Sequence, residues 1–262
     1  GSSYVPSVWP LGAPLFLALA YYLGADQGLY LATPVVGLIS AALTLPLTLA
    51  LCQDQSKQHR FLAGGIAVAI VATSFSQLDR GIVPLADLHA QLLTSAAVLA
   101  TLAAKKEGQL KWVSIAGAVI GLAYLVRHTQ AVLVLLALIP LSNLPKRRWP
   151  SFGLSFLLGI VPLVAADFAY HWTAFGSPFH FEQARELSFF SLSTVPTVMG
   201  RVWSEFSGQS ELWWLWPLAL LAMWDWWRRK PDALFTLGLV IGGLLVVSLP
   251  YQHLMLRDLL PA

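Results

Sequence analysis

The sequence predicts an all-α fold: a polytopic transmembrane helical bundle of about eight spans plus one short interfacial or re-entrant helix. Three observations lead to this prediction. Of the 262 residues, 57% are hydrophobic and only 11% are charged, and the mean hydropathy is +0.67. Several apolar runs approach the roughly 20 residues that cross a bilayer. The basic residues, finally, gather in alternate connectors between these runs.

The apolar runs define the predicted elements in order. The first, at 11–23, lies between Pro10 and Gly24; because it is too short to span, we expect it to lie in the interface or to re-enter from one side. Some later runs also fall short of 20 residues, which predicts loop ends in the interface or a locally thinned bilayer. The expected spans cover 29–52, 61–78, 86–104, 112–126, 130–143, 152–172, 212–227 and 233–250.

The basic residues predict the orientation of these spans. Eleven of the 16 Lys and Arg fall in the connectors at 53–60, 105–111, 144–151 and 228–232, which the positive-inside rule makes cytoplasmic. Most histidines and acids lie near the opposite, outer face. The net charge of +3 therefore reflects orientation in a plasma (inner) membrane, with lipids as partners, and it does not indicate nucleic-acid binding.

The same orientation places both termini on the outer face. An outward N-terminus needs a cleaved signal peptide or a preceding span, and the opening residues Gly1 to Tyr4 are neither basic nor apolar. We therefore expect the chain to be an internal fragment of a longer protein. Within it, 1–262 reads as a single transmembrane domain with 173–211 as a long outer loop, and loops of that length usually serve a function.

Soluble-enzyme signatures are missing from the sequence: it has no phosphate-binding Gly-rich loop, zinc-type Cys pair, His-Glu-x-x-His or Gly-x-Ser-x-Gly. Candidate chemistry must come from polar groups near the outer face. Asp87 opens the third span, either as an N-terminal charge favoured by the helix dipole or as part of an outer pocket. His89 follows two residues later and should point in another direction, which disfavours a shared metal site.

Two further outer-face positions are candidates. Arg127 lies in the tight turn between the fourth and fifth spans and either reaches to lipid phosphate or holds a substrate phosphate bidentately. Its neighbour His128 is expected to be a plain interfacial histidine. Asp167 lies inside the outer end of the sixth span, where an unpaired carboxylate is costly. It should face the bundle or a wet cavity with His171 one turn later, as a functional pocket or as a simple structural pair.

The charged residues of the long outer loop are first explained as local pairs on a helix surface, without a role in a site. Glu182, Arg185 and Glu186 are spaced for local pairs on a solvated helix face. The tryptophans at both ends of the seventh span are expected to form an aromatic belt at the membrane interfaces.

Several motifs, in their order along the chain, resemble the C-type superfamily of polytopic glycosyltransferases, and within it the protein-mannosyltransferase and aminoarabinose-transferase-like branch. The opening segment looks like the one that follows this family's first outer loop. The motifs are Tyr4-x5-Pro10-x-Gly12, Pro84-x-x-Asp87, Gly121-Leu-Ala followed by Arg127, Phe175-Gly176-Ser177-Pro178, and Tyr251 with Arg257-x-Leu-Leu-Pro261.

The resemblance implies transfer of a sugar from a polyprenyl-phosphate carrier to an acceptor at the outer membrane face, under the loop 173–211. In this family an acid of the first outer loop deprotonates the acceptor or binds a metal. No residue here is therefore assigned as catalytic or as a metal ligand, and a divalent metal is left open for the full-length protein. The implied substrate contacts are Arg127 and Arg257 on the phosphate, Asp87 and Asp167 in the pocket, and His180, Glu182 and Arg185 on the acceptor.

Two other classes of function compete with this interpretation. A transporter or flippase without chemistry predicts interrupted helices at matching positions of two halves, with polar residues at mid-membrane. The sequence shows no such pairing, and its ionisable groups cluster near one face. A non-catalytic scaffold would need neither the outer-face histidines nor the long loop.

Overall fold

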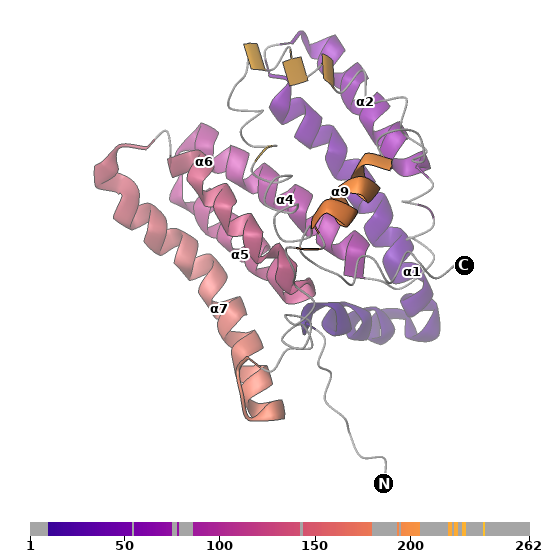
Figure 1. Cartoon of the computed structure of the whole chain (residues 1–262), viewed down its shortest axis with the longest axis vertical. Coiled ribbons are helices and arrows are strands. Elements are labelled where there is room, and N and C mark those ends of the chain that lie inside the picture. Colours follow the sequence, from indigo (N-terminus) through magenta and orange to yellow (C-terminus); the bar gives the residue numbers. More distant parts are fainter. Residues whose placement is uncertain are drawn as a thin grey trace. The chain divides into compact units, whose positions relative to one another are not determined.

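The structure is a computed structural model, and its described part is helical throughout, without a β-strand. It describes residues 10–53, 55–74, 78, 86–141, 144–179, 193 and 195–204, and the single residues 220, 221, 223, 224, 227, 228 and 238. The chain divides into two compact units, 1–180 and 181–262, which are described separately. Within the first unit, α4 packs against both α1 and α5, and α5 packs against α7 (Figure 1).

Helix α1, Gly12–Leu51, is interrupted near its start. Gly24 and Ala25 leave the helical conformation, so the first segment ends where the sequence predicts the end of the helix at 11–23. Figure 1 shows that this segment, in indigo, turns away from the rest of α1. The helix then resumes at once rather than at residue 29, and it contains Pro34 and Pro46.

The break in α1 places a side chain in a strained conformation, which leads to a testable prediction. Ala25 has φ 49° and ψ −137°, a combination that costs a residue with a Cβ about 1–3 kcal/mol. Ala25→Gly should therefore raise the free energy of unfolding by about 1 kcal/mol, measured by unfolding in mixed detergent micelles. Ala18→Gly, in the regular first segment, is the control and should lower it by about 1 kcal/mol.

The end of α1 and the start of α2, Lys57–Thr73, are fixed together by polar contacts. Ser56 caps α2, because its hydroxyl accepts from the His59 amide. The Arg60 guanidinium donates to the carbonyl oxygen of Leu49 at 2.8 Å, which satisfies one of the free carbonyls at the end of α1. Helix α2 begins four residues before the start of the predicted span at 61–78, and it ends at Thr73, five residues before the end of that span.

The core is built around α4, Ala86–Glu107, and α5, Leu110–Val126. Their facing sides are rich in alanine, so the two helices approach closely, and large side chains fill the remaining space. The buried core includes Leu88, Ala97, Ala100, Ala104, Ile120, Ala123 and Leu133.

The predicted span at 130–143 has an unexpected structure. It forms a 3-10 helix, η1 (His128–Ala137), followed by one α-helical turn, α6 (Leu138–Leu141). A 3-10 helix rises about 2.0 Å per residue against about 1.5 Å for an α-helix. The fourteen residues of the two elements therefore extend about 26 Å rather than about 21 Å. The segment has too few residues to cross a full bilayer as an α-helix. Because the 3-10 helix rises more per residue, the same residues extend further.

Glycines bring α5 and α7, Trp149–Phe175, into backbone contact. A Cβ on Gly159 would overlap the carbonyl oxygen of Ser114, and a Cβ on Gly117 would overlap that of Phe156. Small residues permit this kind of close helix packing in membranes. The contact fixes the register of the two helices, and the polar residues discussed below lie about two turns beyond it.

Three helices are long and apolar enough to cross a membrane by length and composition, namely Gly12–Leu51, Ala86–Glu107 and Lys146–Phe175, the last joining the 3-10 turn η2 (Lys146–Arg148) to α7. The helices Leu110–Val126 and His128–Leu141 are apolar but shorter. These findings support a membrane protein with transmembrane helices. The predicted spans at 212–227 and 233–250 lie almost wholly outside the described residues. In the second unit, α9 (Val195–Ser204) forms a ten-residue helix inside the predicted loop at 173–211.

Candidate functional site

Polar residues meet at the end of the first unit that the sequence predicts to be the outer one. The end of α5, the start of η1 and the last two turns of α7 contribute them, together with the first turn of α4. The first segment of α1 closes this end, since Gly12 lies against the backbone of Leu125 and Val126. Each of these elements except α1 supplies one or two polar side chains to the site.

The centre of the site is Asp167, whose side chain has no exposed surface. Its Oδ2 accepts a hydrogen bond from the Tyr124 hydroxyl at 3.1 Å and lies 3.2 Å from His128 Nε2. His171 Nδ1 lies 3.6 Å from Asp167 Oδ1 and 2.9 Å from its backbone carbonyl oxygen. We call Tyr124, His128, Asp167 and His171 the Asp167 cluster.

The cluster compensates for the burial of a carboxylate. Moving a carboxylate out of water is expensive unless donors surround it, and here the hydrogen-bond partners of Oδ2 come from α5 and η1. The rings also pack on one another: the centroids of Tyr124 and His128 are 4.8 Å apart, and those of His128 and His171 are 6.1 Å apart. The arrangement therefore ties the start of η1 to α5 and α7.

An ion pair lies beside this cluster and reaches the surface. Arg127 Nη1 donates to Asp87 Oδ1, and the two side chains are 41% and 22% exposed. Arg127 is the extended residue between α5 and η1, with φ −155° and ψ 111°. Its side chain can therefore reach Asp87 on α4 while the next residue, His128, reaches Asp167 on α7. A guanidinium has five N–H donors, so this pairing leaves donors for an anionic ligand.

Two more contacts position the surrounding elements. His89 is 3% exposed and packs against the Phe16 ring of the first α1 segment, with the ring centroids 5.1 Å apart. The Thr94 hydroxyl donates to Gln130 Oε1 at 3.0 Å, which links α4 to the first turn of η1. Asp87 and His89 thus have different partners, as their spacing predicts.

The structure brings together some of the predicted site residues. Asp87 meets Arg127, and His171 shares a buried face with Asp167 as predicted. His128 is 11% exposed and lies against Asp167, a contact that the sequence did not predict. Sequence reasoning also missed Tyr124, although it lies only four residues before His128 in the chain. Arg257, His180, Glu182 and Arg185 lie outside the described residues.

Among the residues that the structure describes, no group of three or more His, Cys, Asp or Glu side chains is arranged to hold a metal ion. The Asp167 cluster is instead held together by hydrogen bonds and ring contacts. What the arrangement offers chemically is a partly exposed cation held beside a buried polar network, in which Asp167 Oδ1 and His171 Nε2 make no hydrogen bond within the described residues.

No protein-family model matches the chain, and no curated protein and no solved structure matches it either.

Proposed function

We propose that the protein is a membrane glycosyltransferase that moves a sugar from a polyprenyl-phosphate-linked donor to an acceptor at the outer face of the plasma membrane. One observation carries the proposal: the partly exposed Arg127, paired with Asp87, lies directly beside the buried Asp167 cluster. The motif resemblance to C-type glycosyltransferases supplies the reaction class that suits such a site.

In the proposed reaction, a hydroxyl oxygen of the acceptor forms a bond to the anomeric carbon of the sugar. The bond between that carbon and the phosphate oxygen breaks, and its electron pair leaves with polyprenyl phosphate. The phosphate gains one negative charge in this step. A fixed guanidinium therefore stabilises the transition state more strongly than it stabilises the bound donor before reaction. The acceptor proton passes to a carboxylate, which in the resembled family belongs to the first outer loop.

Asp87 and the Asp167 cluster would act on this step through Arg127. The ion pair with Asp87 orients the guanidinium. The hydrogen bond between His128 and Asp167 holds the backbone on the other side of Arg127. A phosphate-binding group held from both sides loses less entropy when the donor binds. We therefore assign Asp87 and His128 as positioning residues.

The proposed location follows from the two substrates. A lipid-linked donor arrives from the bilayer and a polar acceptor from the aqueous side, so the reaction belongs at an interface. With the Lys/Arg-rich connectors on the cytoplasmic side, that interface is the outer one. Arg257, His180, Glu182 and Arg185 stay as predicted contacts to the phosphate and the acceptor.

The test measures release of polyprenyl phosphate from a radiolabelled polyprenyl-phosphate sugar by membranes that contain the full-length gene product. Arg127→Ala should lower the rate by about 10²–10³, the usual effect of removing one donor to a developing oxyanion. Arg127→Lys should retain part of the activity, because it keeps the charge but loses the bidentate geometry. Lys57→Ala, at the opposite end of the bundle, is the control and should leave the rate unchanged.

Equal rates in the wild type and Arg127→Ala would remove Arg127 from the mechanism. A different result would favour the competing class of function: if sealed vesicles move the intact lipid-linked sugar across the membrane and release no polyprenyl phosphate, the protein is a flippase.

A further inference from the structure

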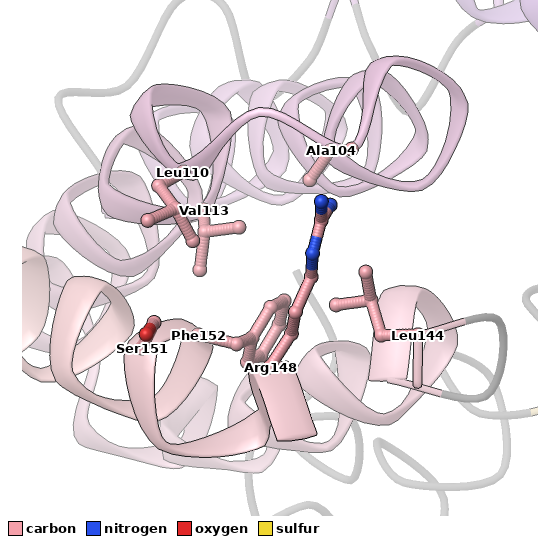
Figure 2. Close-up of a pocket in the computed structure, with 8 residues that line it drawn as sticks. Ala104, Leu110, Val113, Leu144, Arg148, Ser151 and Phe152 are labelled. Carbon is pink, nitrogen blue, oxygen red and sulfur yellow. The ribbon is translucent and has the colours of Figure 1, made fainter. Parts of the chain in front are cut away.

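A hollow lies at the other end of the first unit, among the Lys/Arg-rich connectors. It has a volume of about 170 Å³, and its lining comes from the end of α4, the start of α5 and the start of α7 (Figure 2). A volume of about 10–15 Å³ already admits one water molecule, so the hollow has room for a larger polar group. The lining residues are Ala104, Gly108, Leu110, Val113, Leu144, Arg148, Ser151 and Phe152.

The hollow combines an apolar floor with a cation. Ala104, Val113 and Phe152 are buried side chains, and they give its inner surface an apolar character. Figure 2 shows that the Arg148 side chain extends from the start of α7 across the hollow toward Ala104 on α4. Within the described part of the chain, the Arg148 guanidinium makes no hydrogen bond or ion pair. This combination suits the boundary between a charged headgroup and an apolar chain.

The charges around the hollow leave a surplus of positive charge. The C-terminus of α4 carries the equivalent of about half a negative charge, and Lys105 and Lys106 already lie in its last turn. The one acid nearby in sequence, Glu107, accepts a hydrogen bond from the Trp112 indole at 2.7 Å. The two lysines already more than balance the partial negative charge at the end of α4, so the additional positive charge of Arg148 is not balanced by this helix end.

We propose that this hollow binds a phosphate group, which Arg148 holds. A guanidinium matches phosphate geometry through paired N–H donors, and basic pockets between helices on the cytoplasmic side of membranes bind anionic headgroups. The phosphate belongs either to an anionic lipid or to a small soluble phosphate compound. The site lies apart from the Asp167 cluster, and the proposal does not depend on glycosyl transfer.

The experiment incorporates the purified full chain into vesicles of phosphatidylcholine mixed with phosphatidylglycerol. Native mass spectrometry after mild extraction then counts the phosphatidylglycerol that the protein retains. Arg148→Gln should lower this retention roughly tenfold, the effect of losing one hydrogen-bonded charged partner. Arg147 and Arg148 are both exposed, but only Arg148 lines the hollow. Arg147→Gln therefore removes the same charge from outside the hollow and should change retention by less than about twofold.

A second variant tests the hollow without changing any charge. Ser151 also lines the hollow, so Ser151→Leu should fill part of it and lower retention, and the proposal stays testable if Arg148→Gln does not fold. Equal losses in Arg148→Gln and Arg147→Gln would overturn the proposal, because they would indicate general attraction to a basic surface. Unchanged retention in both Arg148→Gln and Ser151→Leu would overturn it as well.

Added inorganic phosphate distinguishes the two sources of the ligand. If it displaces phosphatidylglycerol from the wild type, and its own binding is lost in Arg148→Gln, the site accepts soluble phosphate. If phosphatidylglycerol stays bound in its presence, the site is specific for a lipid headgroup. Both results support a phosphate site, whereas phosphatidylglycerol retention that Arg148→Gln does not lower, together with no binding of inorganic phosphate by the wild type, contradicts it.

Discussion

Gly159→Leu is expected to lower the free energy of unfolding by about 3 kcal/mol or more. Any Cβ at this position overlaps the carbonyl oxygen of Ser114, and the backbone nitrogen of Ala118 lies next to it. Backbone atoms cannot turn aside as a side chain can, so α5 and α7 must separate. Unfolding of the purified protein in mixed detergent micelles, followed by circular dichroism, measures the loss.

A matched glycine on the same helix provides the control. A Cβ on Gly153 meets nothing within 4 Å, so Gly153→Ala should stabilise the helix by up to about 1 kcal/mol through its better helix propensity. Gly159→Ala gains the same helix propensity, but it should still destabilise the protein because its Cβ overlaps the backbone of α5. If both alanine variants are equally stable, the close approach of α5 and α7 at Gly159 does not exist.

Asp167→Ala is expected to have an effect of similar size, about 3 kcal/mol or more. The substitution removes the shared acceptor of the Tyr124 hydroxyl and His128 Nε2 and leaves a small void. Each buried donor that loses its partner costs about 1–3 kcal/mol. Because His128 begins η1 directly after Arg127, the ion pair between Arg127 and Asp87 should loosen as well.

The same unfolding experiment tests Asp167→Ala against Asp26→Ala, in which an exposed acid of α1 is replaced. Asp26→Ala should change the free energy of unfolding by less than about 0.5 kcal/mol. Asp167→Asn keeps the shape of the side chain and one acceptor oxygen, so its effect on the free energy of unfolding should lie between those of Asp167→Ala and Asp26→Ala. A small effect of Asp167→Ala, equal to that of Asp26→Ala, would contradict the network around Asp167.

Much of the helical architecture could be predicted from the sequence, because apolar runs must satisfy their backbone groups internally in a bilayer. The run at 112–126 corresponds to α5 within two residues, and the break at Gly24 falls where predicted. The 3-10 winding of η1 could not be predicted, because hydropathy measures how apolar a segment is and not how tightly it winds. The close contact at Gly159 was also missed, although Gly117 and Gly121 are spaced as in a small-residue packing motif.

The candidate site was predicted only in pieces. Arg127 and Asp87 were both predicted, but nothing local in the sequence pairs residues 40 positions apart. Asp167 and His171 are one turn apart, so their shared face followed from helical periodicity. His128 could not be paired with Asp167, since the pairing depends on how α7 packs against α5.

The sequence by itself determined the all-helical character of this protein, its suitability for a membrane, and the segregation of basic connectors, because these properties depend on hydropathy and charge along the chain. The tertiary structure alone decided which polar residues meet. Backbone contact at Gly117 and Gly159 sets the register of α5 and α7, and this register places Tyr124 and His128 on Asp167. Side chains that are distant in sequence become partners only through helix packing, which carries no local signature.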